Sequence, residues 1–133
     1  MHIDLGDVVR SALLELGCEE SMLSDFDGHS TIMLDFNDRP ALFISTEENN
    51  VWLWSRIAEE NSSLLALRGG ELLPALMEGY GFSVCGQLQL TFSEGYLLLR
   101  AMIAPAVLQD TEQFSVALEE FFNQQERFVG MIQ

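Results

Sequence analysis

Basic side chains are scarce in this sequence. Its 133 residues include no lysine and six arginines against 21 aspartates and glutamates, for a formal net charge of −15. Nucleic-acid binding needs clustered cations to neutralise phosphates, so this composition excludes a nucleic acid as an expected partner. An anionic membrane surface would repel the chain for the same reason. Because 13 of the 21 acids lie in residues 1–60, a basic partner would be steered toward that half.

Long apolar runs are also missing. A helix that spans a bilayer needs about 20 consecutive apolar residues, whereas the run at residues 96–99 ends at Arg100 and the run at 101–104 ends at Pro105. Residues 1–10 lack the basic cluster and apolar stretch of a secretory signal. We therefore expect a soluble, cytoplasmic protein without a membrane partner.

Cysteine and histidine, which often carry nucleophilic and metal chemistry, number only two each. A thiol hydrolase that uses Cys18 or Cys85 with His29 is one alternative, but turn hydrogen bonds explain His29 without catalysis. No Cys or His lies at ligand spacing from another, and phosphate-binding glycine loops are absent. A disulfide between the two cysteines is not expected inside a cell. We therefore expect no enzymatic activity, no metal and no cofactor.

The apolar residues of the first half change from helical to strand periodicity. Between Asp4 and Leu16 they form one helical stripe, which Asp4 can cap and Gly17 can end. Apolar residues then alternate in three short segments, at residues 31–36, 41–46 and 51–56. The short polar connections between these segments predict an antiparallel three-stranded meander.

The second half predicts a helix, a hairpin and another helix. Residues 62–77 have helical apolar density, although Gly69, Gly70 and Pro74 are expected to interrupt it. Strands are predicted at residues 87–92 and 96–103. The final helix, capped by Asp110 with Gln113 in a capping box, follows them. The order helix, three strands, helix, two strands, helix predicts one α+β domain over residues 1–133, with a twisted antiparallel sheet packed by helices.

Both faces of the predicted meander are apolar. If alternate residues such as Ile32, Leu42 and Leu53 face the helices, a second set points to the other side. That set, here named the platform, consists of Met33, Phe43, Trp52 and Trp54. A small antiparallel sheet usually shows water one polar face, so the platform is either a core or dimer seam or a surface that binds an apolar segment of a partner. Leu14, off the stripe of the first helix, is a further candidate partner-binding residue.

Ordered short segments along almost the whole chain carry a family resemblance. They are Leu5, residues 8–13, 17–18, 27–32, 51–54, 77–79, 86–88, 114–115 and 121–122. In this order, and with this length and acidity, the sequence resembles the type III secretion chaperones of the invasion protein B or SpaK-like kind, the class I, multi-effector group. It departs from that pattern at Gly69, Gly70 and Pro74, in a region that helps to build the dimer in related chaperones.

The resemblance implies a homodimer of α/β subunits whose clients are virulence effectors, bound through extended amino-terminal segments before export. It implies no cofactor and no hydrolysis, and the secretion ATPase is a further expected partner. We therefore predict a cytoplasmic chaperone that keeps the amino-terminal segment of effectors soluble and partly unfolded and promotes its delivery to a type III secretion apparatus. The alternative is a dimeric adaptor that binds a folded regulatory protein. An extended client could hydrogen-bond to a sheet edge while its side chains enter apolar pockets.

Overall fold

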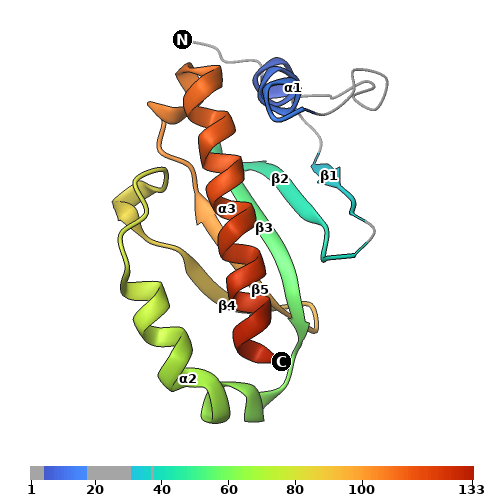
Figure 1. Cartoon of the computed structure of the whole chain (residues 1–133), viewed down its shortest axis with the longest axis vertical. Coiled ribbons are helices and arrows are strands. Elements are labelled where there is room, and N and C mark those ends of the chain that lie inside the picture. Colours follow the sequence, from blue (N-terminus) through green and yellow to red (C-terminus); the bar gives the residue numbers. More distant parts are fainter. Residues whose placement is uncertain (1–4, 18–30, 37) are drawn as a thin grey trace.

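The structure is a computed structural model that describes residues 5–17, 31–36 and 38–133. Along the chain (Figure 1) its elements are α1 (Leu5–Glu15), β1 (Ile32–Leu34), β2 (Leu42–Glu47), β3 (Asn50–Glu59), α2 (Ser62–Met77), the 3₁₀ turn η2 (Val84–Gly86), β4 (Gln89–Ser93), β5 (Tyr96–Met102), the 3₁₀ turn η3 (Val107–Gln109) and α3 (Thr111–Ile132). The predicted order of helices and strands is confirmed. The predicted cap Asp4 and the thiol and imidazole candidates Cys18 and His29 lie outside the described residues.

All five strands form one antiparallel sheet in the order β1-β2-β3-β5-β4. Two tight hairpins join β2 to β3 and β4 to β5. Both turn residues of each have positive φ, Glu48 with Asn49 and Glu94 with Gly95, as a type I′ turn requires. Strand β3 was predicted to end at Arg56, but it continues to Glu59 past an irregularity in register between Arg56 and Ala58. The pairing of β3 with β5 joins the two hairpins into one sheet.

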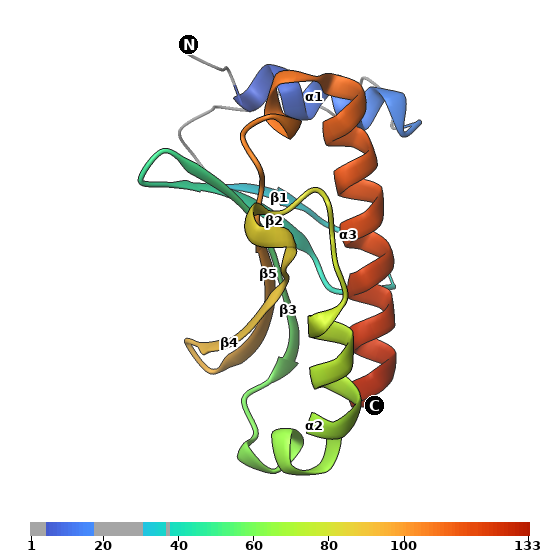
Figure 2. The same cartoon turned by 90° about the vertical axis from the view of Figure 1, so that its left-hand side faces the viewer.

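Helices α2 and α3 lie on one side of the sheet, and no described helix covers the opposite side, which we name the outer face (Figure 2). The core fills the space between α3 and the sheet. Its α3 side chains recur at helical spacing and are fully buried: Phe114, Ala117, Leu118, Phe121 and Phe128. From the sheet, Leu42, Ile44 and Leu53 meet them with no exposed surface, as the alternating pattern predicted.

Helix α2 is continuous from Ser62 to Met77, so the predicted interruption at Gly69, Gly70 and Pro74 is wrong. Proline removes one backbone donor, which leaves the carbonyl of Gly70 without its helical partner. Gly70 is solvent-exposed, so water can bond to that carbonyl. Burial of Leu72 and Ala75 against the core then offsets the weak helix propensity of the segment.

The predicted helix ends are largely confirmed. Gly17 has φ of +93°, and its N–H donates to the carbonyl of Leu14, so it ends the first helix as expected. Asp110 accepts a hydrogen bond from the backbone N–H of Glu112 at 3.0 Å and caps α3. The Gln113 side chain donates to the Asp110 carboxylate at 3.3 Å, so the pair is a side-chain contact and not the reciprocal backbone bond of a capping box.

A buried polar network fastens α3 to the sheet. Gln125, with no exposed surface, donates from Nε2 to the carbonyl of Pro40 and to Ser55 Oγ, both at 2.8 Å. Its Oε1 accepts from Arg39 Nε at 2.9 Å, and Ser55 Oγ donates to the carbonyl of Ala41. Every polar atom of the Gln125 amide therefore has a partner, as a buried amide requires.

An exposed ion pair between Glu78 and Arg127 makes a small, pH-dependent contribution to stability. The guanidinium of Arg127 donates to Glu78 and holds the pKa of that carboxyl below its ordinary value of 4.5. A depressed pKa stabilises the folded state above the ordinary value, and this stabilisation is lost as the pH falls through the folded value. Glu78→Gln should therefore lower the thermal midpoint slightly at pH 7.

The difference in midpoint between Glu78→Gln and the unmodified chain should shrink as the pH falls through the lowered pKa of Glu78, because both side chains then become neutral. Thermal melts followed by circular dichroism from pH 7 to pH 3 measure this difference. Glu119→Gln is the matched control, since Glu119 is exposed on α3 and forms no ion pair with the described residues. A difference for Glu78→Gln that grows on acidification would contradict the assignment.

Candidate partner-binding site

One row of side chains crosses all five strands on the outer face. Met33 pairs with Phe43, Phe43 with Trp54, Trp54 with Arg100, and Arg100 with Gln89. Directly opposed residues of antiparallel strands project to the same side, so the register alone aligns these five. The face that the helices leave uncovered therefore carries aromatic and cationic groups side by side.

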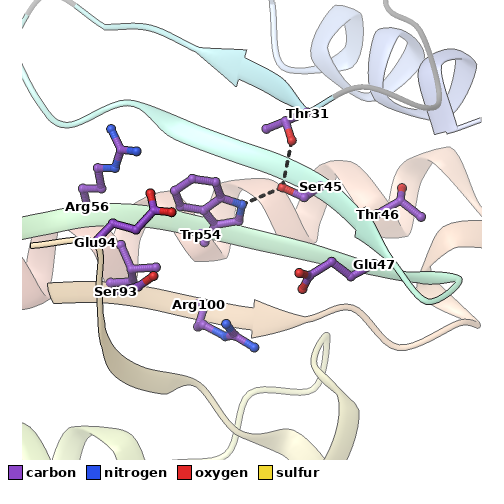
Figure 3. Close-up of a pocket in the computed structure, with 10 residues that line it drawn as sticks. Thr31, Ser45, Thr46, Glu47, Trp54, Arg56, Ser93, Glu94 and Arg100 are labelled. Carbon is purple, nitrogen blue, oxygen red and sulfur yellow. Dashed lines mark hydrogen bonds between the residues drawn. The ribbon is translucent and has the colours of Figure 1, made fainter. Parts of the chain in front are cut away.

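Phe43 and Trp54 form the centre of this row. Their rings stack with centroids 4.1 Å apart and planes inclined by 12°. Trp54 Nε1 donates to Ser45 Oγ at 2.7 Å, and Ser45 Oγ lies 3.4 Å from Thr31 Oγ1 (Figure 3). The indole is thus fixed in orientation by one stack and one hydrogen bond, while both rings remain half-buried. A fixed aromatic surface that is partly open to solvent suits binding of an apolar side chain.

Two arginines lie against the aromatic rings of the outer face. The guanidinium carbon of Arg100 lies 3.9 Å from the ring centroid of Trp52. That of Arg56 lies 5.5 Å from the ring centroid of Phe43, 5.8 Å from Trp54 and 4.9 Å from Tyr96. These distances are those of cation–π contacts. We name Phe43, Trp52, Trp54, Arg56 and Arg100 the aromatic–arginine cluster.

A shallow pocket of about 360 Å³ adjoins the cluster. It is drawn in Figure 3, with β2, β3 and β5 as its floor and Ser93 and Glu94 at one end. Trp54, Arg56 and Arg100 line it together with the carboxylate of Glu47. Its lining therefore combines one aromatic ring with charged groups of both signs, which is the composition of a surface that recognises a mixed apolar and polar segment.

The structure brings three of the five predicted partner-binding residues to an accessible place on one face. Met33 is 56% exposed, and Phe43 and Trp54 are half-buried beside it. Trp52 points to the same face but is 8% exposed beneath Arg100, so it supports the site and offers little free surface. Leu14 is 41% exposed on α1, which packs against α3, and it is therefore not part of the outer face.

Ser45, Arg56 and Arg100 belong to the site but were not among the predicted residues. Arg56 could have been found, since it continues the alternation of Trp52 and Trp54 along β3. Ser45 likewise shares the parity of Phe43 along β2. The position of Arg100 could not have been predicted, because it depends on the register between β3 and β5, which local patterns do not determine.

Metal binding finds no support among the described residues. The part of the chain that the structure describes holds no group of three or more His, Cys, Asp or Glu side chains that could bind a metal ion. Cys85 is a free, exposed thiol. The helices of the described ranges are also too short or too polar to cross a bilayer. The outer face remains the strongest candidate for function.

Comparisons with known proteins agree with this picture. The model of the invasion protein B family matches residues 17–94. The surface presentation of antigens protein SpaK of Salmonella typhimurium and that of Salmonella typhi are each 40% identical over 127 residues, which cover 96% of this chain and 94% of theirs. A chain of the heterodimeric ExoU–SpcU complex from the type III secretion system of Pseudomonas aeruginosa has a similar fold. Its TM-score is 0.61 at 18% identity, over 94% of this chain and 98% of that one. The chain therefore belongs to the invasion protein B family and has the fold of a type III secretion chaperone.

Proposed function

We propose that this protein is a cytoplasmic chaperone for secreted effectors. It binds an amino-terminal effector segment in extended form, keeps that segment soluble and partly unfolded, and promotes its delivery to a type III secretion apparatus and the secretion ATPase. The outer face carries the proposal, because the stacked Phe43 and Trp54 lie half-buried on a sheet surface that no described helix covers. Membership of the invasion protein B family supports it.

The mechanism needs only binding energy. Aromatic rings held in place bury apolar side chains of the client at little entropic cost, and the bound segment is thereby withheld from aggregation. A net charge of −15 keeps the chaperone soluble despite its exposed apolar groups and attracts basic stretches of the client.

Co-expression tests the proposal directly. The chain is produced with the amino-terminal ~100 residues of an effector encoded with the same secretion system, a length in line with an interface of this class. A stoichiometric complex in which the effector segment exchanges its amide hydrogens rapidly is expected. If no effector segment is bound, or if the bound partner remains as protected as a folded protein, the proposal fails.

We further propose that two copies associate through α2. Leu73 and Met77 are 60% and 72% exposed, and they lie one turn apart on the same side of that helix. Small residues precede them on this side, at Ala66, Gly69 and Gly70, which allows a close approach of two helices. Glycines that do not break α2 are consistent with a role as contact positions.

Leu73→Glu should convert the dimer into a monomer at micromolar concentration. A carboxylate placed in an apolar seam adds its desolvation cost to the repulsion between two acidic subunits, which should weaken association by about 100-fold or more. Sedimentation velocity measures the change. Leu67→Glu is the matched control: Leu67 is 78% exposed but lies about 120° around the helix from Leu73. Equal effects of both variants, or a monomeric unmodified chain, would contradict this seam.

A further inference from the structure

The arginines of the outer face have no ion-pair partner among the described residues, although the chain is strongly acidic. Arg39, Arg68 and Arg127 each form an ion pair with a glutamate, at Glu126, Glu71 and Glu78. Among the described residues, neither Arg56 nor Arg100 forms one. Since the chain has 21 acids and six arginines, two guanidiniums on one face that form no ion pair with the described residues are unusual.

The guanidinium of Arg100 also lacks a hydrogen-bond acceptor at one of its nitrogens. Its Nε is buried and donates no hydrogen bond within the described part of the chain. A guanidinium that is partly removed from water without a full set of acceptors costs free energy, and one such donor needs an explanation. Packing against Trp52 accounts for the position of the guanidinium but supplies no hydrogen-bond acceptor in the plane of its N–H groups.

The two guanidiniums lie on the same face but on opposite sides of Trp54 (Figure 3), because that of Arg100 lies over Trp52 and that of Arg56 near Phe43 and Tyr96. Arg100 is directly opposite Trp54, and Arg56 is two residues further along β3, opposite Leu98. The two arginines are therefore diagonal neighbours on one face, about 7–8 Å apart at the backbone. Both line the pocket beside the Phe43–Trp54 stack. Glu47 and Glu94 line the same pocket, and neither pairs with these arginines.

We infer that the aromatic–arginine cluster recognises an acidic side chain of an extended peptide, whose carboxylate binds Arg100 while a neighbouring apolar side chain packs on Phe43 and Trp54. The inference rests on the proposed function and names a chemical feature of the client. Arginine is suited to this role because its planar fork bonds both oxygens of a carboxylate, and stacking on a ring keeps the fork in place. A client that is basic elsewhere would then present an Asp or Glu where it crosses the outer face.

Two displayed peptide libraries test the inference without a known client. Both contain peptides of about ten residues with alternating apolar and polar positions, long enough to cross the sheet in extended form. One library places Asp or Glu at the polar positions, and the other places Ser, Asn or Gln. The purified full-length chain should enrich the acidic library about tenfold or more over the neutral one, as expected for hydrogen bonds to a charged group. The enrichment should weaken as salt is raised.

Arg100→Met should abolish this enrichment without lowering the thermal midpoint, because methionine still packs on Trp52 and the unsatisfied donor is removed. Arg68→Met changes the net charge equally but lies on α2 beside Glu71, so it should leave the enrichment intact. A merely structural role for Arg100 predicts the reverse, a lower midpoint with unchanged selectivity.

Equal binding of both libraries, preference for the neutral library, or binding of neither would overturn the inference while leaving the co-expression test of the chaperone function unaffected. A change in sedimentation of Arg100→Met without a change in peptide selectivity would also overturn it, since the face would then be occupied by a second copy of the chain.

Discussion

Gln125→Ala is expected to lower the free energy of unfolding by about 3 kcal/mol. The substitution removes the acceptor of Arg39 Nε and the donor to Ser55 and Pro40, and it leaves a void next to Ser55, which has no exposed surface. Each buried polar group that loses its partner costs about 1–3 kcal/mol, and the void adds to this cost. A single side chain therefore contributes a large part of the attachment of α3 to the sheet.

Urea denaturation of Gln125→Ala and the unmodified chain measures this loss as a change in midpoint at constant slope. Asn123→Ala is the matched control, since Asn123 is exposed on the same helix and alanine favours helix there. In a double-mutant cycle, Ser55→Ala should cost clearly less in the Gln125→Ala background, because the two side chains share a hydrogen bond. Additive losses would show that Gln125 and Ser55 are not coupled, and a loss for Gln125→Ala below about 1 kcal/mol would show that the network is dispensable.

Trp54→Ala is expected to weaken client binding by about 2–3 kcal/mol, which corresponds to roughly 30- to 150-fold in affinity. The substitution removes the stack on Phe43 and the group that Ser45 orients. Because the indole is half-buried, the cost to folding should be smaller, about 1–2 kcal/mol. Loss of binding that exceeds loss of stability is the result that distinguishes a binding platform from a core.

Titration calorimetry with the co-expressed effector segment and urea denaturation give the two quantities. Trp54→Phe keeps the stacked ring but removes the indole donor and should retain most of the affinity. Trp52→Ala is an informative contrast: Trp52 is 8% exposed beneath Arg100, so its removal should lower stability at least as much as binding. If Trp54→Ala lowered stability and affinity equally, the core or seam interpretation of the platform would be correct.

Sequence patterns predicted the elements well where each element has its own periodicity and terminators. The stripe of the first helix, the ending at Gly17 and the alternation around Phe43 all report local geometry, and the structure follows them. Helix α2 shows where such local signals fail. Its glycines and proline carry a propensity cost that burial of Leu72 and Ala75 outweighs, and this burial cannot be recognised until the core is known.

The candidate site was predicted only in part, for a related reason. Alternation along single strands placed Met33, Phe43 and Trp54 on one face. The burial of Trp52 and the contribution of Arg100 follow from the β3–β5 register, which unites residues from opposite halves of the chain. The exposed fraction of a ring depends on its cross-strand neighbours. Strand alternation alone therefore could not predict that Trp52 is less exposed than Trp54.

The late pairing of β3 with β5 also determines when, during synthesis, the proposed binding face is complete. The β2–β3 hairpin can close as soon as it leaves the ribosome, within microseconds. Arg100 and one part of the pocket floor come from β5. Helix α3, whose aromatic residues cover the inner side of the sheet, is translated last. A nascent chain therefore exposes its tryptophans for several seconds, at about 5–20 residues per second, before the sheet is complete. Its high negative charge repels neighbouring nascent chains and thereby protects the unfinished chain from aggregation during this interval.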